Sequence, residues 1–130
     1  MSRENVEIVK RGVEDVAATG KPPWALLDED IETYDHDTPD QGAYMGHAGY
    51  GRWLEDWEAA WGEWTIEPEE YVDAGDSVVV VIRMRATGRG SGLELSRQDA
   101  MVFKLRNGLV IRLDYYNDRA AALNAVGLAG

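Results

Sequence analysis

The first regular pattern along the chain is helical. Between residues 3 and 19 apolar side chains recur three and four positions apart, which places them on one face of a helix. These positions are Val6, Val9, Val13 and either Val16 or Ala17. The glycine and paired prolines that follow predict the end of this helix near residue 20, and a second short helix, opened by proline, over residues 23–30.

The pattern then changes twice before residue 64. Residues 31–35 (IETYD) alternate and predict a short strand that ends at Asp35, followed by a loop over residues 36–46. From residue 47 to 64 the large apolar groups return to helical spacing, with acidic side chains on the opposite face. They are Tyr50, Trp53, Leu54, Trp57 and Trp61.

The second half of the chain has the pattern of an antiparallel sheet. Strands separated by turns are predicted over residues 64–74, 77–88, 93–106 and 109–118. Asn107 and Gly108 are typical of a tight hairpin between the last two, and residues 118–127 predict a short helix capped by Asp118. Helices followed by a run of antiparallel strands indicate an α+β fold with helices packed on one face of a sheet.

Two of these strands are apolar on both faces. In residues 77–84 (SVVVVIRM) the branched side chains follow one another without alternation, and residues 100–103 (AMVF) of the next strand are also all apolar. An antiparallel sheet with one face in water would alternate. We therefore expect both faces to be covered, one by helices and the other by a second copy of the protein, which predicts a homodimer through the outer face.

Composition limits the possible functions. The chain of 130 residues predicts one domain, residues 1–130, and the absence of cysteine excludes disulfides, thiol catalysis and cysteine–zinc sites. A net charge of −11 would repel nucleic acid and anionic membranes, so neither is an expected partner. The first ten residues lack the apolar core of a signal peptide and no apolar run could span a bilayer, which predicts a cytoplasmic protein.

Two histidines stand among acidic side chains. His36 and His47 lie near Asp35, Asp37 and Asp40, but their spacing matches no known ligand motif. No metal site is therefore expected.

One residue does not fit the strand in which it lies. Asp114 stands in the middle of IRLDYYND (residues 111–118), although aspartate is rare in strands. Its ionised carboxylate is costly to bury without a partner. Asp114 must therefore face water, an ion pair or a pocket.

The order of these motifs resembles a known family. The segments SRENVEIVKRG, YMGHAGYGRWLEDW, EPEEYVDAGDSVVVV and NGLVIRLDYYND, with a short strand ending in aspartate, are similar to the SnoaL-like branch of the nuclear transport factor two-like superfamily. The resemblance covers nearly the whole chain. It implies a cone-shaped, curved antiparallel sheet wrapped by N-terminal helices around an apolar pocket (a cystatin-like α+β barrel), commonly dimerised through the back of the sheet.

The ketosteroid isomerase-like members of this superfamily offer one pattern for comparison. They use an aspartate base on the first strand, and Asp35 lies there. They also need two hydrogen-bond donors for the enolate oxygen. The matching positions are Gly12 and Met101, whose side chains cannot donate.

Two further patterns involve Asp114. Limonene epoxide hydrolase-like members use an Asp–Arg–Asp set; Asp114 matches its last aspartate, while Arg97 and Asp99 supply the other residue types on a neighbouring strand. SnoaL-like polyketide cyclases use an acid/base aspartate at the place of Asp114. They usually pair it with a histidine, where this chain has Met101 or nearby Asp99.

The resemblance thus implies a pocket for a small, largely apolar molecule. Asp114 is expected to point into it as acid/base, with Asp35 as a second polar contact and Arg97 with Asp99 as an orienting pair. The residues expected to line the pocket are Trp53, Trp57, Met101, Phe103, Arg112 and Tyr116.

Three functions remain open. The first is a cofactor-independent acid/base enzyme of cyclase, isomerase or hydrolase type, acting on a small apolar carbonyl or epoxide compound. The second is a non-catalytic small-molecule-binding protein of the same fold, which the missing donors favour. The third is a structural dimerisation module. Asp114 itself also has an alternative role, in which it forms a structural ion pair with Arg97 or Arg112 and does no chemistry.

Overall fold

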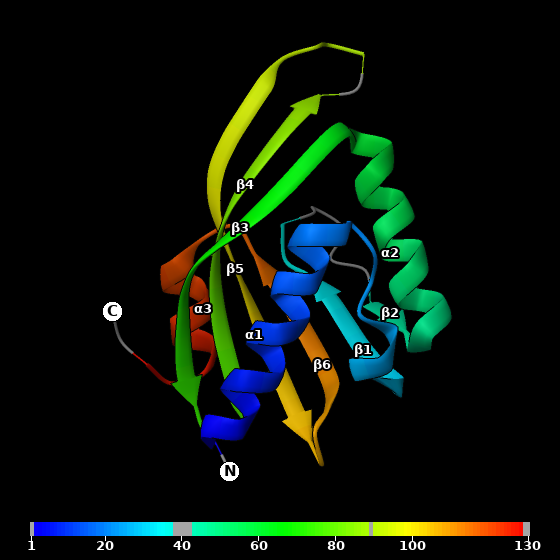
Figure 1. Cartoon of the computed structure of the whole chain (residues 1–130). Helices are drawn as coiled ribbons and strands as arrows, with labels where there is room; N and C mark the ends of the chain where they lie inside the picture. Colours follow the sequence, from blue (N-terminus) through cyan, green and yellow to red (C-terminus); the bar gives the residue numbers. More distant parts are fainter. Residues whose placement is uncertain (1, 38–42, 89, 129–130) are drawn as a thin grey trace.

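The computed structural model describes residues 2–37, 43–88 and 90–128 (Figure 1). Within these residues the helical elements are α1 (Ser2–Thr19), the short 3-10 helix η1 (Trp24–Leu26), α2 (Gly46–Ala60) and α3 (Arg119–Ala125). The strands are β1 (Leu27–Asp35), β2 (Ala43–Met45), β3 (Trp61–Ala74), β4 (Ser77–Gly88), β5 (Glu94–Arg106) and β6 (Leu109–Tyr116).

The six strands form one curved sheet in the order β2-β1-β6-β5-β4-β3. Neighbouring strands run antiparallel except β1 and β6, which are parallel, with Tyr34 opposite Asp114 and Asp35 opposite Tyr115. The sheet is therefore mixed, not wholly antiparallel as the sequence predicted. The C-terminal end of β4 and the N-terminal end of β5 project beyond the helices (Figure 1).

Helices α1 and α2 cover the inner face of the sheet. Val9 and Val13 of α1 and Trp53 of α2 pack in one buried cluster with Ile82 of β4 and Phe103 of β5. The valine spacing read from the sequence is therefore the buried stripe of α1. Fully burying a side chain of this size is worth roughly 1.5–3 kcal/mol. The helices and the curved sheet together give the predicted cone-shaped α+β fold.

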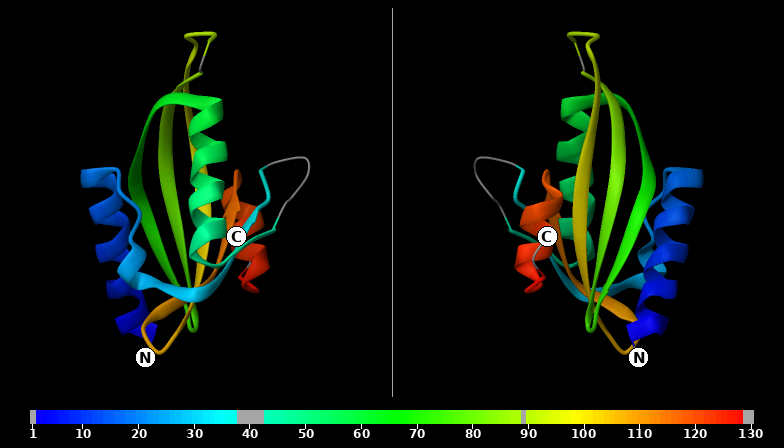
Figure 2. Two further views of the ribbon diagram at one scale, coloured as in Figure 1. Left: turned by 90° about the vertical axis from the view of Figure 1, so that its right-hand side faces the viewer. Right: turned by 90° about the vertical axis from the view of Figure 1, so that its left-hand side faces the viewer.

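Helix α3 lies on the opposite face of the sheet from α1 (Figure 2). Its Ala122 and Leu123 form a second buried cluster with outward-pointing residues of β4 and β5, which are Val79, Val81, Ala100 and Val102. These four strand residues are at most 6% exposed in the single chain. The doubly apolar strands are thus explained by the chain's own C-terminal helix, and the premise for a second copy as their cover is wrong.

Two local predictions hold in detail. At the turn between β5 and β6 both Asn107 and Gly108 have positive φ angles, 54° and 80°, as a type I′ hairpin turn requires. Asp118 caps α3, because its side chain accepts a hydrogen bond from the backbone N–H of Ala120.

Three segment assignments differ from the sequence prediction. The helix expected over residues 23–30 is only η1, because Leu27 already pairs with Val110 as the first residue of β1. The helix expected to reach residue 64 ends at Ala60, and Trp61 begins β3 opposite Gly88. Part of the expected loop, Ala43–Met45, pairs with β1 as a short edge strand. No helix among the described residues is both long enough and apolar enough to cross a membrane.

Candidate functional site: an apolar cavity beside a buried charge network

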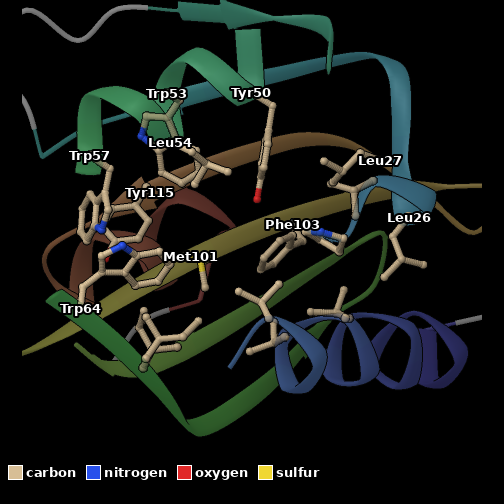
Figure 3. Close-up of a pocket in the computed structure, with 18 residues that line it drawn as sticks. Leu26, Leu27, Tyr50, Trp53, Leu54, Trp57, Trp64, Met101, Phe103 and Tyr115 are labelled. Atoms are coloured by element: carbon tan, nitrogen blue, oxygen red, sulfur yellow. The ribbon is translucent and has the colours of Figure 1, made fainter. Parts of the chain in front are cut away.

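A cavity lies between helices α1 and α2 and the inner face of the sheet (Figure 3). Its lining combines aliphatic residues with six aromatic ones, which are Tyr50, Trp53, Trp57, Trp64, Phe103 and Tyr115. The volume is about 80 Å³ for water-sized occupants, whereas one water needs roughly 10–15 Å³ by this measure. The cavity therefore has room for a molecule of about one ring.

One tyrosine hydroxyl points into the middle of this cavity. Tyr50 extends from α2 between Leu54 and Phe103, and its oxygen is directed away from the helix (Figure 3). The residue is 7% exposed, and burial raises the pKa of the Tyr50 hydroxyl, so it is protonated at neutral pH. Among the described residues no hydrogen-bond partner lies beside this hydroxyl.

Aromatic rings close one end of the cavity (Figure 3). The ring centroid of Trp57 lies 5.3 Å from that of Tyr115 and 6.4 Å from that of Trp64, both in edge-on geometry. The ring centroid of Trp53 lies 5.8 Å from that of Tyr115. Rings at these separations are in contact and leave no gap for a ligand between them.

Behind these rings lies the first of two buried carboxylates on this side of the sheet; the third buried aspartate of the described residues, Asp114, lies on the other face. Asp35, the last residue of β1, is 4% exposed. Its Oδ2 accepts a hydrogen bond of 2.7 Å from Nε1 of Trp53, and its Oδ1 accepts one of 2.9 Å from the backbone N–H of Asp37. Asp35 therefore supports the wall of the cavity and does not line it.

The second buried carboxylate, Asp99 of β5, is fully buried. Its Oδ2 accepts a hydrogen bond from the hydroxyl of Tyr115, and its Oδ1 lies 2.8 Å from Nε of Arg97. Burial raises the pKa of Asp99, although Tyr115 and Arg97 both act to lower it. Burial and the charge of Asp99 together raise the pKa of Tyr115 well above its usual value.

Arg97 links Asp99 to a third aspartate. Its Nη2 donates to Oδ2 of Asp37, and its guanidinium lies 6.0 Å from the ring centroid of Trp61. Burial opposes the positive charge, but the two carboxylates raise the pKa of Arg97. The residues Asp37, Arg97 and Asp99 thus form an Asp–Arg–Asp chain that does not line the cavity and contacts its lining through Tyr115.

Asp114 lies on the other face of the sheet. Its Oδ2 accepts a hydrogen bond of 2.8 Å from Nε of Arg112, and its Oδ1 lies 2.8 Å from Nε2 of His36. The His36 ring stacks on Tyr116 at 4.4 Å, while Arg112 lies 4.2 Å from the ring centroid of Tyr34. The hydrogen bonds that Arg112 donates to Asp114 raise the pKa of Arg112.

Of the six residues expected to line a pocket, four lie around this cavity and two do not. Trp53, Trp57, Met101 and Phe103 line the cavity. Arg112 and Tyr116 do not, because β6 directs Leu113 and Tyr115 inward and the residues between and beyond them outward. The expectation that Asp114 points into the pocket is wrong for the same reason.

The expected charge network is divided between the two faces. Arg97 and Asp99 lie together near the cavity, with Asp35 in the wall, and Arg112 pairs with Asp114 outside. Sequence reasoning missed Tyr115 as the partner of Asp99. The available signal was Leu113, whose apolar side chain shares a strand face with Tyr115 and marks that face as the inner one.

The histidines have structural partners. His36 contacts Asp114, and Nε2 of His47 lies 2.8 Å from the backbone oxygen of Leu27. No group of three possible metal ligands occurs in the part of the chain that the structure describes, and Asp40 lies outside it.

Solved structures share this fold at low sequence identity. An NTF2-like protein of unknown function from Burkholderia pseudomallei superposes with a TM-score of 0.78 at 19% identity, covering 95% of this chain and 98% of its own. TerC, crystallised with polyporic acid, has a TM-score of 0.76 at 19% identity over 95% and 98%. A putative SnoaL-like polyketide cyclase from Jannaschia sp. CCS1 has a TM-score of 0.74 at 21% identity over 98% and 94%.

At the level of sequence, no curated protein matches the chain. The profile of the SnoaL-like domain matches residues 10–113, which run from α1 into β6 and include most of the residues that enclose the cavity. The chain therefore belongs to the SnoaL-like domain family.

Proposed function

We propose that the protein binds a small, mostly apolar molecule in the cavity between α1, α2 and the sheet. The observation that carries this proposal is the lining, which is apolar or aromatic throughout and contains no lysine, arginine, histidine, aspartate or glutamate among the described residues. Concave, largely apolar sites with few polar groups are the usual form of small-molecule pockets.

Binding is favoured over catalysis by the state of the carboxylates. Both oxygens of Asp35 accept hydrogen bonds, from Trp53 and from the backbone of Asp37. Asp99 accepts a hydrogen bond from Tyr115 and forms an ion pair with Arg97. An acid/base group must reach the proton it transfers within hydrogen-bond distance, and neither carboxylate lines the cavity.

The size of the cavity narrows the ligand class to molecules of about one ring. Suitable probes are α-methylstyrene and acetophenone, which have nearly the same shape and differ by a methylene group in place of the carbonyl oxygen. Trp53, Trp57 and Trp64 line the cavity, so occupancy should change the tryptophan fluorescence, and calorimetry gives the affinity.

A blocking variant tests the place of binding. Val13 of α1 is 5% exposed and lines the cavity, whereas Arg11 is exposed on the same helix. Val13→Phe fills the cavity and should abolish binding of both probes, while Arg11→Phe adds the same ring outside and should not. Absence of binding to the unmodified protein, or equal binding to Val13→Phe, would contradict the proposal.

A second candidate is acid–base chemistry by Asp99 through the cavity-lining Tyr115. The observation in its favour is Asp99, a buried carboxyl with a raised pKa, which is hydrogen-bonded to the cavity-lining Tyr115. Hydrolysis of styrene oxide to its diol is the direct test. Turnover by the unmodified protein that is lost in Asp99→Asn and retained in Asp114→Asn would favour the enzyme over the binding protein.

A further inference from the structure

We propose that Tyr50 is the specificity-determining residue of the cavity and donates a hydrogen bond to an uncharged oxygen of the ligand, such as a ketone or ether oxygen. This inference rests on the proposed function, because it names the class of molecule that the same cavity would hold. The ligand expected from this inference is an apolar molecule of about one ring that carries one uncharged hydrogen-bond acceptor.

The first support is geometric. Tyr50 is more than nine-tenths buried, at 7% exposure, and its hydroxyl is directed into the cavity (Figure 3). None of the described residues makes a hydrogen bond with it. The hydroxyl is open to the cavity, so a ligand that fills the cavity must accept its hydrogen or leave the hydroxyl unsatisfied, which is costly in free energy. A hydrocarbon of the same shape leaves it unsatisfied.

The other polar groups near the cavity are engaged or distant. The hydroxyl of Tyr115 donates to Asp99, and Nε1 of Trp53 donates to Asp35. The indole nitrogens of Trp57 and Trp64 lie at the closed aromatic end, away from the Tyr50 oxygen (Figure 3). The Tyr50 hydroxyl is therefore the group placed to meet a ligand oxygen in the middle of the cavity.

The charges in and around the cavity argue against an ionised ligand. No cationic side chain lines the cavity, and the nearby Arg97 is already paired with Asp37 and Asp99. A carboxylate ligand would also approach a chain of net charge −11. A cationic ligand would find no free carboxylate on the lining. Because burial raises the pKa of Tyr50, its hydroxyl keeps the proton that it donates.

The test uses the intact protein and three probes of similar shape. Acetophenone carries the acceptor oxygen, α-methylstyrene replaces it with a methylene group, and benzoate carries a charge. Each is titrated calorimetrically into the unmodified protein, into Tyr50→Phe, and into Trp57→Phe, which removes an indole N–H from the other end of the cavity.

We expect Tyr50→Phe to weaken acetophenone binding by about threefold to tenfold, the usual effect of one neutral hydrogen bond. Binding of α-methylstyrene should be unchanged or tighter, and benzoate should bind none of the proteins. Trp57→Phe should have the same ratio of acetophenone affinity to α-methylstyrene affinity as the unmodified protein. The melting temperature of Tyr50→Phe should not fall, because the hydroxyl has no partner to lose; a structural role would lower it.

A measurement on the unmodified protein tests the same inference independently. The carbonyl stretch of bound acetophenone should lie at lower frequency than in a hydrocarbon solvent, because the oxygen accepts a hydrogen bond. The role of Tyr50 would be overturned by an unshifted carbonyl stretch or by tight benzoate binding. It would also be overturned if the ratio of acetophenone to α-methylstyrene affinity were unchanged in Tyr50→Phe, or were lost in Trp57→Phe instead. The proposed function fails separately, when α-methylstyrene and acetophenone both fail to bind the unmodified protein.

Discussion

Arg112 holds both carboxylate oxygens of Asp114, which lies two positions further along β6. Nε and Nη2 of Arg112 are 2.8 Å and 3.1 Å from Oδ2 and Oδ1, and Nε2 of His36 is 2.8 Å from Oδ1. All three side chains lie on the face of the sheet opposite the cavity. The charge of the aspartate in the middle of a strand is therefore balanced by Arg112, and its burial needs no ligand.

Replacing this aspartate should affect stability and leave the cavity unchanged. Asp114→Asn removes hydrogen bonds to a charged group, so we expect the free energy of unfolding to fall by about 1.5–3 kcal/mol. The fall should be near the lower value, because the Arg112 side chain is 44% exposed and water can replace its partner. Urea unfolding measures the change, and acetophenone affinity should stay the same.

Glu67→Gln is the matched control for this change. Glu67 pairs with Arg85 at 3.1 Å on the same outer face, but their side chains are 66% and 56% exposed. Exposed pairs of this kind contribute about 0–1 kcal/mol, so Glu67→Gln should change stability less than Asp114→Asn. If Asp114→Asn abolished probe binding without loss of stability, the structural role of Asp114 would be wrong.

The sequence prediction for β6 groups the residues of each face correctly but assigns the wrong face to the inside. Alternation correctly grouped Arg112, Asp114 and Tyr116. The opposite face carries Leu113 and Tyr115, and the apolar Leu113 marks it as the inner one. The expectation for Asp114 followed the family resemblance instead, which places an acid/base aspartate in the pocket. Helix α3 weakens the local signal, because it buries apolar residues of the outer face as well.

Element boundaries failed where pairing between distant segments overrides local propensity. Residues 27–30 read as helix from their leucine and acidic side chains, yet β1 is fixed by its parallel pairing with β6, more than seventy positions away in the chain. Trp61 continued the aromatic stripe of α2 but pairs with Gly88 as the start of β3. Propensity and spacing carry no information on such partners.

Gly12 offers a test of how the cavity wall is packed. It lies in α1 and lines the cavity, and a Cβ there would lie 2.5 Å from Cδ1 of Leu26, another lining residue. Gly12→Ala should raise helix stability by about 0.8–1.0 kcal/mol, while Leu26 must turn aside. We therefore expect unfolding free energy near or above that of the unmodified protein, with weaker acetophenone binding.

The control for this change lies on the exposed side of the same helix. Glu14→Ala does not face the cavity and should leave acetophenone affinity unchanged. Equal affinities in Gly12→Ala and the unmodified protein would show that Leu26 moves away from the cavity and not into it.

The homodimer stays a prediction, but the surface available for it is polar and not apolar as the sequence suggested. Beyond α3 the outer face of β3, β4 and β5 is polar, with Arg83 3.6 Å from Glu69 and Arg85 3.1 Å from Glu67. A dimer through this surface should weaken as salt screens its charges. Sedimentation of the micromolar protein at about 0.05 M and about 0.5 M salt tests this; a dimer insensitive to salt would have to use another surface.

The pH dependence of stability should report on Asp99. Burial raises the pKa of this carboxyl in the folded protein, so the folded state binds the proton more tightly than the unfolded chain does. The stability that this proton adds is present below the ordinary aspartate pKa of about 3.9 and is lost as pH rises through the raised folded value. Relative to Asp99→Asn, the unmodified protein should therefore become more stable as pH falls from about 7.5 to about 4.5.

Tyr115→Phe strengthens this test, because the Tyr115 hydroxyl donates to Asp99 and lowers its pKa. Its removal should raise the Asp99 pKa further. At neutral pH it should cost about 1–3 kcal/mol, since a buried carboxylate oxygen loses its donor, and the cost should shrink in acid, where the carboxyl is protonated. NMR titration of the Asp99 carboxyl carbon, with urea unfolding at each pH, measures both effects. An Asp99 that titrates below the ordinary aspartate value would show that its ion pair with Arg97 outweighs burial, and the expected pH dependence would then reverse.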